Sequence, residues 1–193
     1  KKYGYDMAVL AGDKLFIYAF EIAAKAFALT DRADLVGKAI SILANKAGIY
    51  GMIGGQSVDV EYTDRPVTKS QLEFIYELKT AALLEAAMMI GAVLAGADDN
   101  QVKAAEQIAH HVGMAFQIRD DILDVISTTE ELGKPVKSDE KNNKTTYVTI
   151  YGLDGASKLV EEYSHTAMTL LDQVCPNASF LKRLFEYLIV RKK

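Results

Sequence analysis

Proline is scarce in this chain, and its scarcity restricts the possible folds more than any other feature of the sequence. It occurs only at Pro66, Pro135 and Pro176 among 193 residues. Ala, Leu, Ile, Lys and Glu dominate the composition instead, and most of these residues favour helices. No stretch alternates apolar and polar residues as a half-buried strand would. We therefore expect an all-α protein.

The spacing of apolar residues predicts six helical segments. We expect them near residues 5–29, 33–61, 69–94, 101–126, 155–174 and 179–190. Thr68 is placed to cap the third segment, and Asp98 and Asp99 are expected to act as caps rather than as ligands. Because 50% of the residues are hydrophobic, the chain can bury one sizeable core, and we expect a single domain over residues 1–193.

The second predicted segment is unusually rich in glycine, with Gly48, Gly51, Gly54 and Gly55. Each glycine costs a helix up to about 1 kcal/mol relative to alanine. Such a loss calls for a compensating gain, which close approach of another helix or of a ligand would supply. The motif GQxxD at residues 55–59 also places polar side chains on this stretch.

Charge and composition exclude several classes of function. The net charge of −4 argues against nucleic acid as the main partner, because a duplex is bound through surplus basic residues. No run of about 20 apolar residues is available to span a membrane, and we see no signal peptide at the N-terminus. The single Cys175 excludes a disulfide within the chain and a cysteine-based zinc site. A cytoplasmic location is consistent with these features.

The most informative stretch is Phe116–Asp124, where three aspartates interrupt an apolar helical pattern. In a helix, Asp120 and Asp124 lie about 6 Å apart on one side, and Gln117 lies one turn earlier, so we expect these residues and Asp121 to share one face. Like charges at this spacing repel by about 0.2–0.5 kcal/mol per pair, which calls for a cation. Mg²⁺ is a suitable cation, since it is usually held by one or two carboxylates, water and phosphate oxygens.

Simpler interpretations exist for each of these features taken alone. The DDxxD pattern could be a solvated helix face, and Lys79 could be a surface lysine in the middle of a helix. His110 and His111 are adjacent, so their side chains diverge and cannot share a metal as residues one turn apart can; we expect a structural or surface role for them. The polar residues 127–146 are the best candidate for a mobile lid.

Taken together, these stretches resemble the trans-isoprenyl diphosphate synthases, and most closely the bacterial short-chain enzymes that make farnesyl and geranylgeranyl diphosphate. The resemblance extends from Lys1 to Lys193. It rests on FQxxDDxxD at 116–124, GQxxD at 55–59, Lys79-Thr80, Lys134 and Asn143-Lys144-Thr145. It implies an isoprenoid synthase-like bundle of long helices around a central cavity.

The resemblance also implies a metal site. Asp120, Asp121 and Asp124 match the second aspartate-rich motif of the family, whose carboxylates hold Mg²⁺ against the diphosphate of the allylic substrate. Asp139 matches an aspartate of the lid that supports the metal indirectly.

The resemblance implies the following substrate-binding residues around that diphosphate: Lys79, Thr80, Gln117, Lys134 and Lys144. The three lysines would neutralise the leaving group, while Thr80 and Gln117 would turn oxygen dipoles toward the allylic cation. Arg191 and the lysines after it resemble the basic tail that closes over isopentenyl diphosphate.

The implied reaction is a Mg²⁺-dependent prenyl transfer from dimethylallyl or geranyl diphosphate to isopentenyl diphosphate, with farnesyl diphosphate as the expected product. No protein nucleophile is needed, and none of the Ser-His-Asp or Cys-His arrangements is present. The family likeness further implies a homodimer.

The chain departs from the family pattern in one respect. The first aspartate-rich motif, the arginines after it and an upstream Gly-Gly-Lys do not occur. Since Lys1 to Gly4 would follow that motif closely, we expect the N-terminal third of a synthase to be missing and this chain alone to be inactive. The residues that usually set product length lie beside the missing motif.

Three other interpretations fit less well. A non-catalytic subunit of a heteromeric prenyltransferase would have lost aspartates that are intact here. A class I terpene cyclase typically carries an NSE-like triad in place of the second DDxxD. A helical scaffold protein would match the whole set of motifs only by coincidence.

Overall fold

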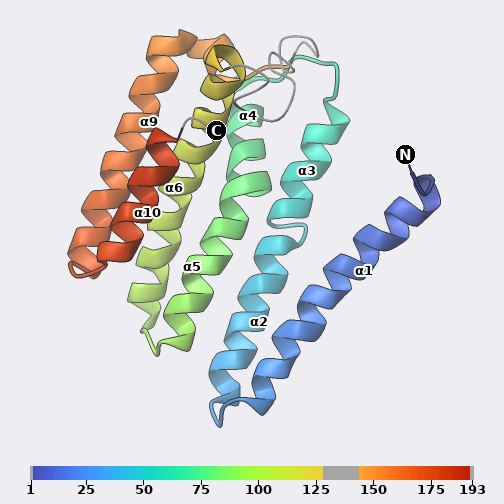
Figure 1. Cartoon of the computed structure of the whole chain (residues 1–193), viewed down its shortest axis with the longest axis vertical. Coiled ribbons are helices and arrows are strands. Elements are labelled where there is room, and N and C mark those ends of the chain that lie inside the picture. Colours follow the sequence, from blue (N-terminus) through green and yellow to red (C-terminus); the bar gives the residue numbers. More distant parts are fainter. Residues whose placement is uncertain (1, 128–143, 192–193) are drawn as a thin grey trace.

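The computed structural model describes residues 2–127 and 144–191, and every regular element in these ranges is a helix, as expected (Figure 1). The elements are α1 (Tyr5–Ala24), η1 (Lys25–Ala28), α2 (Ala33–Ala47), α3 (Met52–Glu61), α4 (Lys69–Tyr76), η2 (Glu77–Ala81), α5 (Ala82–Leu94), α6 (Asp99–Ile126), α9 (Tyr147–Val174) and α10 (Ser179–Val190). Most of the predicted lid, together with Lys134 and Asp139, lies outside the described residues.

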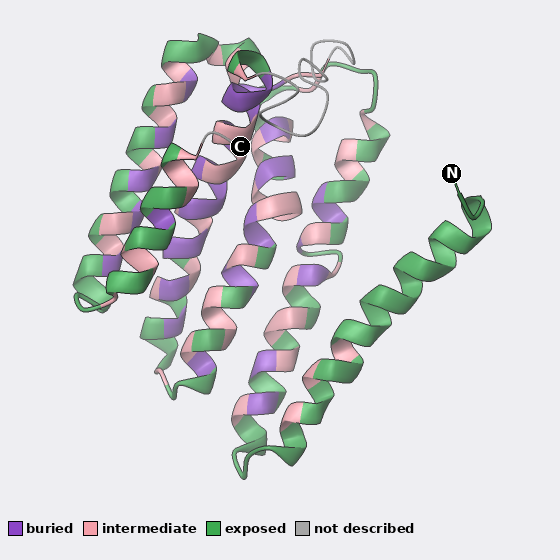
Figure 2. Cartoon of the chain, in the orientation of Figure 1, coloured by how far each residue is buried: buried purple, intermediate pink, exposed green. Residues whose placement is uncertain are grey.

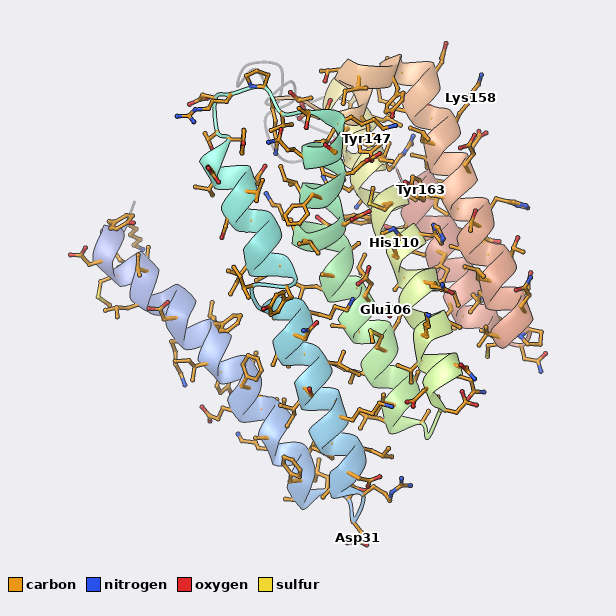
Figure 3. All side chains as sticks on the ribbon, turned by 180° about the vertical axis from the view of Figure 1, so that it is seen from behind. Asp31, Glu106, His110, Tyr147, Lys158 and Tyr163 are labelled. Atoms are coloured by element: carbon orange, nitrogen blue, oxygen red, sulfur yellow. The ribbon has the colours of Figure 1, made fainter. Side chains whose placement is uncertain are left out.

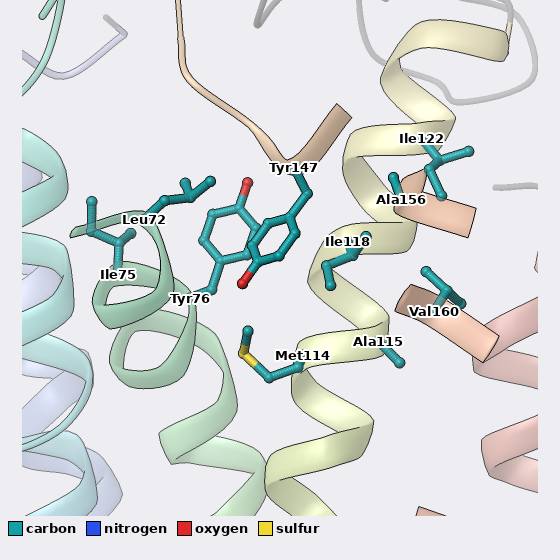
Figure 4. Packing of buried hydrophobic residues seen from close by; sticks show 10 residues of the cluster. All are labelled: Leu72, Ile75, Tyr76, Met114, Ala115, Ile118, Ile122, Tyr147, Ala156 and Val160. Atoms are coloured by element: carbon teal, nitrogen blue, oxygen red, sulfur yellow. The ribbon is translucent and has the colours of Figure 1, made fainter. Parts of the chain in front are cut away.

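Helix α6 is the centre of the bundle. It packs against α5 and η2 on one side and against α9 and α10 on the other (Figure 1). Toward its C-terminal end Met114, Ile118 and Ile122 join the larger buried cluster, where the rings of Tyr76 and Tyr147 lie 5.3 Å apart (Figure 4). A second buried cluster surrounds the N-terminal half of α6, and its members are Ile108, Val112, Ala167, Leu171 and Phe185.

Two of the predicted caps, Thr68 and Asp98, are confirmed, whereas Asp99 is the first residue of α6 and its side chain bonds to Lys38. The side chain of Thr68 accepts a hydrogen bond from the Gln71 backbone amide, and that of Asp98 accepts one from the Gln101 amide. In each case the glutamine side chain accepts in return from the amide of the capping residue, so two helix-end donors are satisfied together.

Two predicted helices differ in detail from the observed ones. The segment expected at 33–61 is divided into α2 and α3, because the chain turns at Gly48–Gly51. The last long helix begins at Tyr147 rather than near Gly155. Its first turns are separated from the rest by Gly152, whose φ of 71° breaks the regular helical spacing.

The segment expected at 69–94 is continuous, but η2 in its middle is a π-helix. A π-turn widens the helix locally and is frequently found at functional sites. Helix α6 crosses this turn at Gly113, where an added Cβ would lie 2.6 Å from the Ala81 Cβ. The two backbones are therefore in direct contact.

Gly113→Ala should lower the free energy of unfolding by about 1–3 kcal/mol, because the new methyl group would overlap Ala81. Gly91→Ala in α5 is the matched control, since a Cβ there meets nothing within 4 Å. It should raise the free energy by up to about 1 kcal/mol through helix propensity. Urea unfolding followed by circular dichroism measures both, and equal effects would contradict the close crossing.

An ionic cluster joins α2, α5 and α6 away from the aspartates. Lys46 bonds to Glu85, and its Nζ lies 2.6 Å from Oε1 of Glu106. Nδ1 of His110 lies 3.2 Å from Oε1 of Glu85 (Figure 3 labels Glu106 and His110 on α6). The hydrogen bond to Glu85 raises the pKa of His110 above its ordinary value despite partial burial. His110 thus has a structural role, which is one of the two roles expected for it from the sequence.

Because the folded-state pKa of His110 is raised, protonated His110 should stabilise the fold fully below about pH 6.5, the ordinary histidine pKa. That contribution should disappear as the pH rises through the folded-state pKa. The difference in melting temperature between wild type and His110→Gln should therefore be larger at pH 6 than at pH 8.5. His165→Gln, a substitution on the exposed side of α9, is the control. A difference that grows with pH would contradict the assignment.

Helix α1 stands apart from this core. None of its residues is buried, and large apolar side chains such as Leu10, Leu15 and Ile17 are exposed by 59%, 69% and 62% (Figure 2). Figure 1 shows α1 close to α2 only near their connection. Among the described helices none is long and apolar enough to cross a membrane.

Candidate functional site

The predicted site residues come from several elements that meet around η2. Lys79 and Thr80 lie on the π-turn itself. Helix α3 lies directly against that turn at Gly55, where an added Cβ would be 2.3 Å from the Lys79 backbone nitrogen. Gly55 therefore permits a close approach between helices, which is one of the two gains expected to compensate for its low helix propensity.

One carboxylate joins the two described lysines of the site. Oδ2 of Asp59 lies 2.6 Å from Nζ of Lys79, and Oδ1 lies 3.4 Å from Nζ of Lys144. Burial raises the pKa of Asp59, but the two lysines lower it further, so that it remains below its ordinary value. Asp59 and Lys144 line a hollow of about 400 Å³. Lys79 lines a neighbouring hollow of about 570 Å³ with Gln56.

Asp59 is a functional candidate that the sequence analysis did not assign. The GQxxD motif marked its position, but the spacing of this motif does not show that its aspartate faces lysines from two distant elements. The available signal was its place on a glycine-rich stretch of the sequence.

Thr80 and Gln117, which the sequence analysis assigned to one site, are in direct contact. The Thr80 hydroxyl donates to Oε1 of Gln117 over 2.8 Å, which connects η2 to α6. Both side chains are half-buried.

The three aspartates do not share one face as expected. Asp120 forms an ion pair with Arg191, whose guanidinium lies 3.6 Å from the centre of the Phe116 ring. Arg119 in turn donates to the backbone carbonyl of Arg191, with Nη2 at 3.1 Å. The C-terminal end of α10 is thus held against α6.

Asp121 is directed into the core instead. It is 4% exposed, and its oxygens accept hydrogen bonds from the Tyr76 hydroxyl at 2.8 and 2.9 Å. Oδ2 also accepts from the Tyr147 backbone amide at 2.9 Å. Asp121 therefore fastens α4 and the start of α9 to α6, a role that helical spacing could not reveal because adjacent residues of a helix point about 100° apart. Asp124 is equally buried.

The donor chemistry fits a magnesium ion held partly by protein. Asp120 already faces a cation in the form of Arg191, and Asp124 lies one turn further along the same helix. Within residues 2–127 and 144–191, no group of three or more His, Cys, Asp or Glu could hold a metal by itself. Mg²⁺ commonly has one or two carboxylate ligands and takes its other ligands from water and phosphate.

Comparisons with known proteins agree with this fold. The structure superimposes on a Helicobacter pylori geranyltransferase crystallised with magnesium and isoprenyl diphosphate, with a TM-score of 0.82 and 33% identity over 97% of this chain and 61% of that one. A putative farnesyl-diphosphate synthase from Marinomonas gives a TM-score of 0.81 with 31% identity, covering 97% of this chain and 64% of that one. The fold is therefore that of the prenyl synthases.

The sequence gives the same result. Residues 1–177 match the polyprenyl synthetase family, and the chain belongs to that family. It is 37% identical to the farnesyl diphosphate synthase of Geobacillus stearothermophilus over 99% of this chain and 64% of that protein. It is 42% identical to a geranylgeranyl diphosphate synthase of Cyanophora paradoxa over 82% of this chain and 53% of that protein. The chain thus spans less than two thirds of the length of these relatives.

Tyr76→Phe should lower the free energy of unfolding by about 1.5–3 kcal/mol, because it removes a buried hydrogen bond to the Asp121 carboxylate. Tyr50→Phe, at a side chain that is 77% exposed, should change it by less than about 0.5 kcal/mol. Chemical denaturation of the two variants measures how much the hydrogen bond from Tyr76 to Asp121 stabilises the fold. Equal free energies of unfolding would show that this bond contributes nothing to stability.

Proposed function

We propose that the protein to which this chain belongs is a Mg²⁺-dependent short-chain trans-prenyl diphosphate synthase, which condenses an allylic diphosphate with isopentenyl diphosphate. The observation that carries the proposal is that Lys79 and Lys144 both contact Asp59 and line two neighbouring hollows, in a chain whose helix α6 carries Asp120 and Asp124. Farnesyl diphosphate is the proposed product, supported by the likeness to the Geobacillus enzyme.

The chemistry requires that a carbon–oxygen bond of the allylic substrate break and leave a diphosphate. Lys79 and Lys144 would donate N–H groups to the oxygens of this leaving group, and Lys134 is proposed to do the same from the segment outside the described residues. Such charges are most effective where water is excluded. Magnesium bound at Asp120 and Asp124 would supply further positive charge to the leaving oxygens.

Thr80 and Gln117 are suited to the positive side of the same step. The Thr80 hydroxyl donates its hydrogen bond to Gln117. The lone pairs of the Thr80 oxygen are therefore left to face an allylic cation. The double bond of isopentenyl diphosphate would attack that cation, and a proton would then pass to the departed diphosphate. No protein nucleophile takes part.

Three assignments are more specific. Asp139 is proposed to support the metal from the segment outside the described residues. Asp121, which the family motif implies as a metal ligand, is proposed to act mainly by fixing the start of α9 near Lys144. Arg191 is proposed to leave Asp120 when metal binds and to move toward the second substrate.

The wider setting is also part of the proposal. A homodimer would cover the exposed apolar side chains of α1, such as Leu15 and Ile17. A cytoplasmic site of action is consistent with the single Cys175. A non-catalytic prenyltransferase subunit is disfavoured by the intact Asp120, Asp124 and Lys79, and a terpene cyclase by the DDxxD form of the motif.

In an active protein that carries this chain, Asp120→Asn should reduce kcat by about 100-fold or more, because the metal would lose a carboxylate ligand and with it several kcal/mol of charge stabilisation. Asp154→Asn on the exposed side of α9 should leave turnover unchanged. The assay is incorporation of labelled isopentenyl diphosphate into prenyl product, with circular dichroism to verify the fold. Wild-type turnover by Asp120→Asn would remove Asp120 from the metal site.

A further inference from the structure

Asp59 has no part in the reaction described so far, although it contacts two of its lysines. It lies on α3 with 15% of its side chain exposed. Each carboxylate oxygen contacts a different lysine: Oδ2 contacts Lys79 on η2, and Oδ1 contacts Lys144 just before α9. A single side chain therefore relates two cations that are far apart in the sequence.

Two lysines would not adopt this arrangement by themselves. Each ammonium is a compact charge at the end of a flexible chain, and two of them repel at short range. A carboxylate between them offsets the repulsion and restricts both side chains. It uses few of their donors, since each ammonium has three N–H groups. Lys79 and Lys144 can therefore still donate to phosphate oxygens while they are bound to Asp59.

The backbone fixes the position of Asp59 as well. Gly55 lies one turn before it on the same side of α3, at the point where α3 contacts the Lys79 backbone. The packing of α3 against η2 consequently brings the backbones at Asp59 and Lys79 close together, so that the flexible Lys79 side chain can reach the carboxylate.

We propose that Asp59 is a positioning residue that holds Lys79 and Lys144 side by side to receive the two phosphate groups of a diphosphate. This inference rests on the proposed function, because it assumes that the lysines bind a diphosphate. It carries an electrostatic cost, since the Asp59 carboxylate itself repels an anion. Loss of the alignment would weaken diphosphate binding, whereas loss of the negative charge would strengthen it. The direction of the change in affinity therefore tests the inference.

The test is the affinity of the chain for inorganic pyrophosphate, measured by isothermal titration calorimetry at a fixed excess of MgCl₂. Asp59→Asn removes one negative charge, so a pure charge effect would tighten binding. Positioning predicts the opposite, a dissociation constant about tenfold higher, because the lysines lose their common partner. Glu61→Gln removes the same charge from an exposed position of α3 and should change the constant by less than about twofold.

A second variant keeps the charge constant. Asp59→Glu retains the carboxylate but lengthens the side chain by one carbon, so positioning again predicts weaker binding. In a Lys144→Met background, the effect of Asp59→Asn should shrink, because one of the two positioned groups is gone. Melting temperatures of all variants show that each is folded, and Asp59→Glu serves if Asp59→Asn does not fold.

The outcomes separate two failures. Equal or tighter pyrophosphate binding by folded Asp59→Asn, or unchanged binding by Asp59→Glu, would overturn the positioning role and leave the proposed function standing. Absence of pyrophosphate binding by the wild-type chain would overturn the proposed site, and the positioning role with it.

Discussion

The site depends on backbone contact between helices, which glycine makes possible at two places. Gly113 brings α6 against the π-turn η2, and Gly55 brings α3 against the same turn from another element. Any side chain at these positions would force the helices apart. Because Lys79 and Thr80 lie on that turn, these two contacts bring Lys79 within reach of Asp59 and Thr80 within reach of Gln117.

Charged groups of the site are paired with one another within the protein. Asp59 faces two lysines, and Asp120 faces Arg191. Such pairing reduces the cost of holding charged groups in a partly buried place. A metal bound at Asp120 would therefore replace an internal cation, Arg191, whereas an anion bound by Lys79 and Lys144 would not have to displace Asp59. Asp121 differs from both, since its hydrogen bonds connect α6 to α4 and α9 within the core.

The sequence predicted the helices and their caps well because apolar spacing and capping residues act locally, as Thr68 and Asp98 show. Through the family resemblance it assigned Thr80 and Gln117 to one site, but it did not predict the hydrogen bond between them. The break at Gly48–Gly51, the π-turn and the inward direction of Asp121 were not predicted. These features depend on tertiary contacts, which local sequence patterns do not encode. The contacts of Asp59 also depend on them, because its two lysine partners come from other elements.

The exposed apolar helix α1 has a consequence for solution work on this chain. Soluble proteins rarely present large continuous apolar surfaces to water, and those that do tend to associate or to bind hydrophobic dyes. Side chains such as Leu10 and Ile17 extend along a helix that packs little against the bundle. Association equilibria should therefore be part of every measurement, and affinities of different variants are comparable only at matched protein concentration.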